Sequence, residues 1–177
     1  MKLETERLQL KEINESYVDD ILKIRSNEII NQYVQRVSPK NNYDALQFIL
    51  MIKENARNHK TFYWGISLKD QSNLIGTICL WNFSEDRTVA EVGYELLPDY
   101  HRKGIMSEAL KAVINFAFNS LLLKEIVAMT HRYNDNSKKL LSKHDFVLEE
   151  GRIDDGIPEN LVFSLKNDGV YSSKSLQ

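Results

Sequence analysis

Residues 96–109, with the sequence LLPDYHRKGIMSEA, join an apolar segment to an amphipathic one. Pro98 has no amide proton to give to a β-ladder, so a strand that reaches this point ends here. From 104 to 120, apolar residues recur every three or four positions, which predicts a helix. The basic run at 101–103 therefore precedes a helix N-terminus, where unpartnered amides and the helix dipole can bind an anion. Such a junction can also be an ordinary solvated turn.

The rest of the chain divides into elements by the period of its apolar residues. Alternation predicts strands, and spacing of three and four predicts helices. Before the junction we expect a strand at 7–13, a helix after Ser16, a helix at 44–58, and a meander of strands at 61–68, 74–83 and 88–96. After it we expect a strand at 125–130, a helix at 136–143, and strands at 146–152 and 161–165.

These elements predict an α/β domain with a mixed, mostly antiparallel sheet of about seven strands flanked by about four helices. A helix separates the strands at 88–96 and 125–130, so these two can lie parallel through a crossover. Helices on both faces of the sheet follow from the order of the elements. We expect one domain over residues 1–166 and a flexible tail at 167–177.

Composition excludes several classes of protein. The chain has 177 residues, 42% of them hydrophobic, and a formal net charge of −2, so it can bury a core and lacks the basic excess of nucleic-acid-binding proteins. Its one cysteine, Cys79, cannot form an intramolecular disulfide, and the four histidines lack metal-ligand spacing. No apolar run resembles a signal peptide or a membrane span. We expect a cytoplasmic protein without a metal, a membrane partner or a nucleic-acid partner.

Four stretches together resemble one known family. YHRKGIMSEAL at 100–110 resembles the acetyl-coenzyme A loop of the Gcn5-related N-acetyltransferases (GNAT), whose pattern is Gln or Arg, two variable residues, Gly, one variable residue, then Gly or Ala. LETERLQL at 3–10, AEVGYEL at 90–96, and NDNS with KHDF within 134–146 are similar to the branch that acetylates ribosomal-protein amino termini (RimJ/RimL type). The resemblance covers about residues 3–166.

The resemblance implies a GNAT fold, acetyl-coenzyme A as co-substrate, and a set of cofactor-binding residues. Backbone groups of Leu96 and Leu97 would bind the pantetheine arm, and Asn134 would hydrogen-bond it. Backbone amides of the loop would hold the pyrophosphate; the loop residues are His101, Arg102, Lys103, Gly104, Ile105, Met106 and Ser107. Two of them depart from the pattern, because His101 stands where the family has Gln or Arg and Met106 where it has Gly or Ala.

Acetyl transfer to an amine needs a base for the ammonium and can use an acid for the departing thiolate. By the resemblance, Glu91 is the candidate base, acting directly or through water, and Ser137, near the sulfur, is the candidate acid. Each has an ordinary alternative. Glu91 could be a solvent-facing partner of Arg87 or Lys69, and Ser137 could serve only in the first turn of a helix.

The acceptor is less determined than the donor. By the resemblance we expect an acetyltransferase acting on a primary amine in a ternary complex, with a protein N-terminus as the acceptor. A polyamine or aminoglycoside is an alternative, and a non-catalytic acyl-coenzyme A-binding module is another. An open groove between the first helix and residues 81–87 would admit a peptide, whereas a closed acidic pocket would favour a polycation. Either a monomer or a homodimer is compatible with the sequence.

Overall fold

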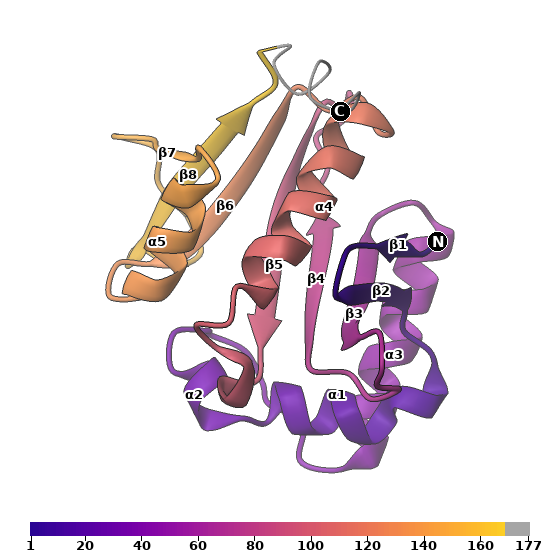
Figure 1. Cartoon of the computed structure of the whole chain (residues 1–177). Coiled ribbons are helices and arrows are strands. Elements are labelled where there is room, and N and C mark those ends of the chain that lie inside the picture. The colour runs from indigo at the N-terminus through magenta and orange to yellow at the C-terminus, as the bar shows by residue number, and fades with distance from the viewer. Residues whose placement is uncertain (169–177) are drawn as a thin grey trace.

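The protein is described over residues 1–168 by a computed structural model, in which these residues form an eight-stranded sheet and five α-helices (Figure 1). The strands are β1 (Leu3–Glu4), β2 (Leu8–Glu12), β3 (Phe62–Leu68), β4 (Gly76–Trp81), β5 (Val89–Leu96), β6 (Glu125–His131), β7 (Val147–Leu148) and β8 (Asn160–Lys166). The helices are α1 (Val18–Arg25), α2 (Glu28–Asn31), α3 (Asn42–Arg57), α4 (Ile105–Asn119) and α5 (Asp135–Lys143). The expected α/β fold is confirmed.

The sequence-based counts fall short by two elements that are too short to show a period. β1 has two residues, and it extends the sheet by pairing antiparallel with β2. α2 has four residues and begins at an Asn27 cap, whose side chain accepts hydrogen bonds from two backbone amides. The strand expected at 146–152 is also mostly irregular, because only Val147 and Leu148 pair with β8.

The sheet opens at one place, between β5 and β6. Strands β2 to β5 form the expected antiparallel meander, and β5 then pairs parallel to β6. That pairing runs only from Val89 opposite Glu125 to Glu91 opposite Val127. Beyond Glu91 the two strands diverge, as Figure 1 shows. The backbone edge of β5 from Val92 to Leu96 is therefore not paired with β6.

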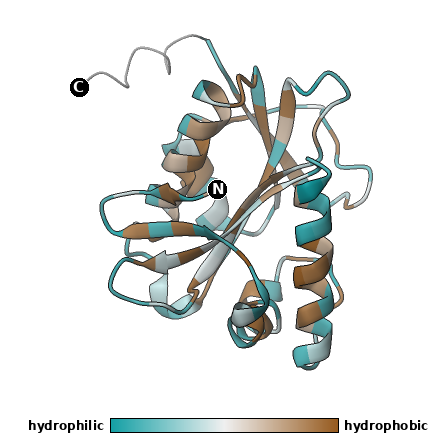
Figure 2. Cartoon of the chain, turned by 90° about the vertical axis from the view of Figure 1, so that its right-hand side faces the viewer, coloured by the Kyte–Doolittle hydropathy of each residue, from teal (hydrophilic) through white to brown (hydrophobic). Residues whose placement is uncertain are grey.

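Two core clusters hold the helices on opposite faces of the sheet (Figure 2). The larger cluster joins α4 to the sheet and includes Ala90, Val92 and Leu96 of β5. The smaller one joins α1 to α3. Successive side chains of a strand point to opposite faces. The odd-numbered residues of β5, Glu91 and Glu95 among them, therefore face away from α4.

The expected tail begins with a residue, Asn167, that is hydrogen-bonded to the rest of the domain. The Asn167 amide donates to the Lys124 carbonyl at 2.8 Å, which bonds this residue to the end of the loop that follows α4. The remainder of the expected tail, 169–177, lies outside the described residues. Within residues 1–168, no helix has both the length and the apolar character needed to cross a bilayer.

Candidate active site

The loop before α4 presents a row of free backbone amides. In residues 1–168, no amide from Arg102 to Ser107 donates a hydrogen bond to a protein acceptor, and no side chain caps the helix. Gly104 is the N-cap with φ of 74°, and Arg102 has φ of 59°, so two residues of this loop are left-handed. The loop thus presents free hydrogen-bond donors at a helix N-terminus, the kind of group that can bind an anion.

Side chains from distant segments brace this loop. The Arg7 guanidinium donates to the Lys103 carbonyl at 3.0 Å and to the Glu108 carboxylate at 2.6 Å. At the other end, the Ser107 hydroxyl lies 2.8 Å from His144 Nε2, which links α4 to the end of α5. The Met106 side chain is only 9% exposed and packs in the α4 core, so it points away from the loop's amides.

The edge of β5 carries the residues expected to contact pantetheine. The Leu97 amide donates to Ile75 of the neighbouring strand segment, and the Leu96 carbonyl accepts from the His101 imidazole at 2.8 Å. Antiparallel pairs alternate between bonded and non-bonded positions, so the Leu96 and Tyr94 amides point away from β4, toward the gap. His101 therefore contributes a side-chain contact to this edge besides its backbone amide.

A pocket of about 1090 Å³ lies at the gap, on the side of the sheet opposite α4 and between the strands. Glu91, Asn134 and Ser137 all line it, although Glu91 is more than forty residues from the other two along the chain. The loop at 101–107 and Leu96 and Leu97 do not line it. The predicted site residues thus lie in two places, the loop before α4 with the end of β5, and this pocket.

Ser137 is buried and hydrogen-bonded to a tyrosine. It is 8% exposed, and its hydroxyl lies 2.8 Å from the Tyr94 hydroxyl of β5, across the gap. Burial raises the pKa of Tyr94 to about 12, so its hydroxyl is protonated at neutral pH. Asn134 caps α5, since its side-chain oxygen accepts from the Ser137 amide at 3.1 Å. The cap also positions Ser137 in the first helical turn, so the structural and the chemical interpretations of Ser137 are compatible.

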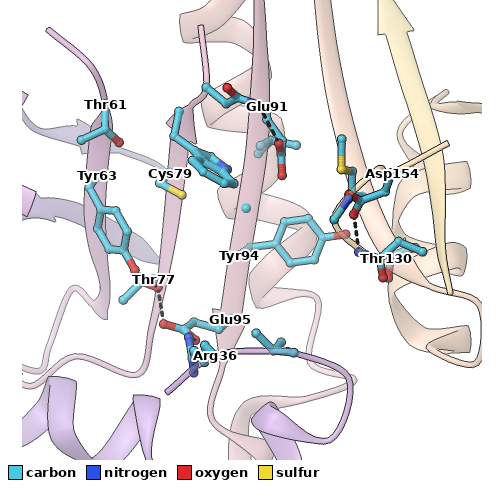
Figure 3. A pocket seen from close by; sticks show the side chains of 18 of the residues that line it. Arg36, Thr61, Tyr63, Thr77, Cys79, Glu91, Tyr94, Glu95, Thr130 and Asp154 are labelled. Carbon is cyan, nitrogen blue, oxygen red and sulfur yellow. Dashed lines mark hydrogen bonds and ion pairs between the residues drawn. The ribbon is translucent and has the colours of Figure 1, made fainter. Parts of the chain in front are cut away.

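Glu91 lines the same pocket from β5 (Figure 3). Its carboxylate accepts a hydrogen bond from Asn82 at 3.4 Å. Burial raises the pKa of Glu91 above its ordinary value, the Asn82 hydrogen bond opposes this shift, and the charge of Asp154 adds to it. Arg87, one suggested partner of Glu91, instead donates to the His59 carbonyl at 2.9 Å. A carboxyl with a raised pKa in a pocket is suited to accept a proton.

Sequence reasoning missed a polar network at the other end of the pocket. Glu95 of β5 accepts a hydrogen bond from Thr77 at 3.0 Å, and Thr77 lies 3.2 Å from the Tyr63 hydroxyl. Arg36 and Arg25 both pair with the Glu95 carboxylate, at 2.6 and 3.6 Å. Side chains alternate along a strand, so Glu95 faces the pocket as Glu91 does. This alternation is the one sequence signal that could have indicated Glu95.

Cys79 also lines the pocket, and burial raises its thiol pKa to about 12. The thiolate is the nucleophilic form of cysteine, so this shift opposes a nucleophilic role. In residues 1–168, no three His, Cys, Asp or Glu side chains lie in an arrangement that could hold a metal ion.

Comparisons with known proteins agree with this architecture. Residues 7–147 match the family described as acetyltransferase (GNAT) domain. The uncharacterized N-acetyltransferase YoaA of Bacillus subtilis (strain 168) is 31% identical over 147 residues, 83% of each chain. Ribosomal-protein-S5-alanine acetyltransferase from Vibrio fischeri superposes with a TM-score of 0.78 at 25% identity, over 95% of this chain and 97% of that one.

A third protein extends the fold comparison. RimL, a ribosomal α-N-protein acetyltransferase solved in complex with coenzyme A, superposes with a TM-score of 0.81 over 94% of this chain and 98% of that one, at 15% identity. Identity this low establishes a shared fold. The match over residues 7–147 and the identity to YoaA establish more: this chain belongs to the GNAT family of N-acetyltransferases.

Proposed function

We propose that this acetyltransferase modifies the N-terminal α-amine of a protein, and that Glu91 and Ser137 perform the proton transfers. Acetyl-coenzyme A, the acetyl donor of the family, supplies an activated thioester. The observation that carries the proposal is the pocket at the β5–β6 gap, which brings Glu91 together with the Ser137–Tyr94 pair. The free amides at 102–107 lie outside this pocket, as expected if donor and acceptor approach from different sides.

The two sides of the gap would divide the chemistry. Glu91 accepts a proton from the acceptor's ammonium, directly or through one water, and so produces the neutral amine that can attack. Backbone amides at the edge of β5, such as that of Tyr94, point toward the gap and can polarise the acetyl carbonyl. Ser137 gives its proton to the departing sulfur as it takes one from Tyr94, and solvent returns a proton to the Tyr94 phenolate once the products leave. Leu96, Leu97 and Asn134 position the pantetheine arm, which favours reaction by holding both reactants in line.

The charges of the pocket favour a peptide over a polycation. Among the described residues its lining holds four carboxylates and four cationic side chains; these are Glu85, Glu91, Glu95 and Asp154, and Arg25, Arg36, Lys60 and Arg87. A polyamine or an aminoglycoside would meet cations as often as carboxylates. The volume of about 1090 Å³ also exceeds the roughly 300–1,000 Å³ of ordinary small-molecule pockets. The structural likeness to ribosomal-protein acetyltransferases supports the same acceptor class.

Coenzyme A release tests the proposal directly. The enzyme is incubated with acetyl-coenzyme A and either short C-terminally amidated peptides, spermidine, or an aminoglycoside. We expect turnover with peptides, and mass spectrometry should place the acetyl group on the α-amine. Faster turnover with spermidine or the aminoglycoside would replace the peptide with a small amine as acceptor. Binding of acetyl-coenzyme A without turnover on any amine would favour a non-catalytic binding module.

A further inference from the structure

Arg25, the last residue of α1, is an arginine with unused hydrogen-bond donors in the wall of the pocket. Its side chain is 14% exposed, and its guanidinium carbon lies 3.6 Å from the centre of the Phe48 ring. Its one ion-pair contact among the described residues, to Glu95, is long at 3.6 Å. Within residues 1–168, its side-chain N–H groups donate no hydrogen bond. A guanidinium carries five donors. No fully buried side-chain nitrogen of the described residues lacks a partner, so the unpaired donors of Arg25 are accessible from the pocket that it lines.

The neighbouring Arg36, by contrast, has close partners for its side-chain donors. Its Nε donates to Asn31 at 2.9 Å, and its Nη1 pairs with Glu95 at 2.6 Å. Arg36 therefore neutralises Glu95 at close range. Arg25, Arg36 and Glu95 together carry one net positive charge. The donors that remain unpaired in this group belong to Arg25. The Arg25 guanidinium lies over the Phe48 ring, and a guanidinium stacked on a ring in this way keeps the N–H groups of its edge for a ligand.

The two ends of the pocket along β5 thus carry opposite charge. Figure 3 shows Glu91 at one end and Glu95 with Arg36 at the other. Glu91 and Glu95 are four residues apart on one face of the strand, so their backbone positions are about 13 Å apart. An acceptor whose amine lies near Glu91 would extend toward Arg25 along this strand.

We propose that Arg25 selects the acceptor by binding the carboxylate of an acidic side chain at the third residue of its N-terminal sequence. This inference rests on the proposed function and names the acceptor's class within it. An extended peptide advances at most about 3.3–3.6 Å per residue, so the third residue lies roughly 7 Å from the first and its side chain covers most of the remaining distance. A free amino acid carries amine and carboxylate on one carbon and cannot reach both ends. Arginine suits this role because its planar fork can bind a carboxylate through two parallel hydrogen bonds.

Paired peptides test the proposal on the unmodified enzyme. Ala-Ala-Asp-Ala amide is compared with Ala-Ala-Asn-Ala amide, and Ala-Asp-Ala-Ala amide with Ala-Asn-Ala-Ala amide. We expect kcat/KM to be at least tenfold higher for the Asp member of the first pair, and a smaller difference in the second pair, whose carboxylate lies one residue short of Arg25. Alanine and alaninamide should show no such difference. A tenfold preference for free alanine would overturn the proposal, because the carboxylate would then come from the reacting residue itself.

Variants assign the preference to Arg25. Arg25→Gln should lower kcat/KM for the preferred Asp peptide at least tenfold, bring it level with its Asn partner, and leave the Asn peptide within about twofold. Arg25→Lys should retain part of the preference. Lys23→Gln is the matched control, because Lys23 is a cation in the same turn of α1, is exposed, and does not line the pocket. It should retain the full preference.

The failures are distinguishable. Acetylation of Asp and Asn peptides at equal rates by the wild type would overturn the role of Arg25 and leave the proposed function intact. An Arg25→Gln variant that loses activity on both peptides equally, with the preference retained, would show that Arg25 only supports Glu95 and Phe48. No turnover on any peptide would overturn the proposed function, and the inference with it. Thermal unfolding and coenzyme A binding of each variant show whether it folds, and the wild-type comparison needs no variant.

Discussion

The position of the Glu91 carboxylate in the pocket predicts how much proton transfer should depend on it. Glu91→Gln should lower kcat by about 10²–10⁴, the range for loss of a general base. Coenzyme A affinity should be unchanged, because Glu91 does not touch the loop at 102–107. Isothermal titration and coenzyme A release measure the two quantities. A large loss of coenzyme A affinity would contradict the separation of donor and acceptor sides.

The pH profile tests the same residue by a second route. The raised pKa of Glu91 means that the carboxylate is protonated, and inactive as a base, at a higher pH than an ordinary glutamate. The acid limb of kcat/KM should therefore lie above the usual glutamate range. The Asn82 hydrogen bond lowers this pKa, so Asn82→Ala should move the limb to higher pH. A limb that does not move would disconnect the pH profile from Glu91.

The Ser137 and Tyr94 hydroxyls, which meet across the gap, should behave as one unit. Ser137→Ala removes the proposed acid, and we expect kcat to fall about 10²-fold. Tyr94→Phe keeps the ring and removes only the hydroxyl that lies 2.8 Å from Ser137, so its effect should be smaller. Because both act on one proton, the double variant should resemble Ser137→Ala alone. If the two losses multiply, Tyr94 acts independently of Ser137.

At the scale of elements, the start of α4 depends on a segment almost one hundred residues earlier. The Arg7 guanidinium binds both the Lys103 carbonyl and the Glu108 carboxylate. Glu108→Gln should weaken this brace, raise the dissociation constant for coenzyme A several-fold, and cost about 1 kcal/mol of stability, the upper range for a partly exposed pair. Lys111→Gln, on an exposed position of the same helix, should change neither quantity.

The stability effect of this brace should also depend on pH. Burial pushes the pKa of Glu108 up, but contacts from Thr5 and Arg7 together outweigh burial and hold the pKa below its ordinary value of 4.5. A depressed folded-state pKa stabilises the protein above the unfolded value and loses that effect as pH falls through the folded value. The Tm difference between wild type and Glu108→Gln should therefore shrink on acidification below about pH 4.5. A difference that is constant with pH would rule out the charge as its source.

For the whole molecule, the meeting of β4 and β5 is the most sensitive point. A Cβ at Gly76 would overlap the Glu95 carbonyl oxygen, and backbone cannot move aside as a side chain can. Gly76→Ala should therefore destabilise the protein by about 3 kcal/mol, the upper end for overpacking. Urea unfolding measures this. Gly156→Ala is the control, because a Cβ at this position on an exposed loop would come no closer than 3.4 Å to a neighbouring atom, Oδ1 of Asp154. Its effect on stability should stay within about 0.5 kcal/mol.

The elements that sequence reasoning found are those whose pattern is local and long. The helix at α4 and the meander of β3 to β5 each show a repeated apolar period, so their positions could be predicted to within a few residues. α2 and β1 could not, because four and two residues are too few to define a period. β7 was expected to be longer, since Val147 and Leu148 are apolar although the structure leaves them exposed.

The sequence by itself determined the fold class, the family resemblance, and the loop before α4, because Pro98, Gly104 and the helix period act on neighbouring residues. It also indicated Glu91, Ser137 and Asn134, whose roles remain predictions. Only the tertiary structure decided that these three residues line one pocket, that Tyr94 meets Ser137, and that Arg25 faces it with free donors. Those relations depend on where β5 and β6 part and on which helix end lies across the sheet. Both are set by contacts between residues far apart in the chain, which no local pattern encodes.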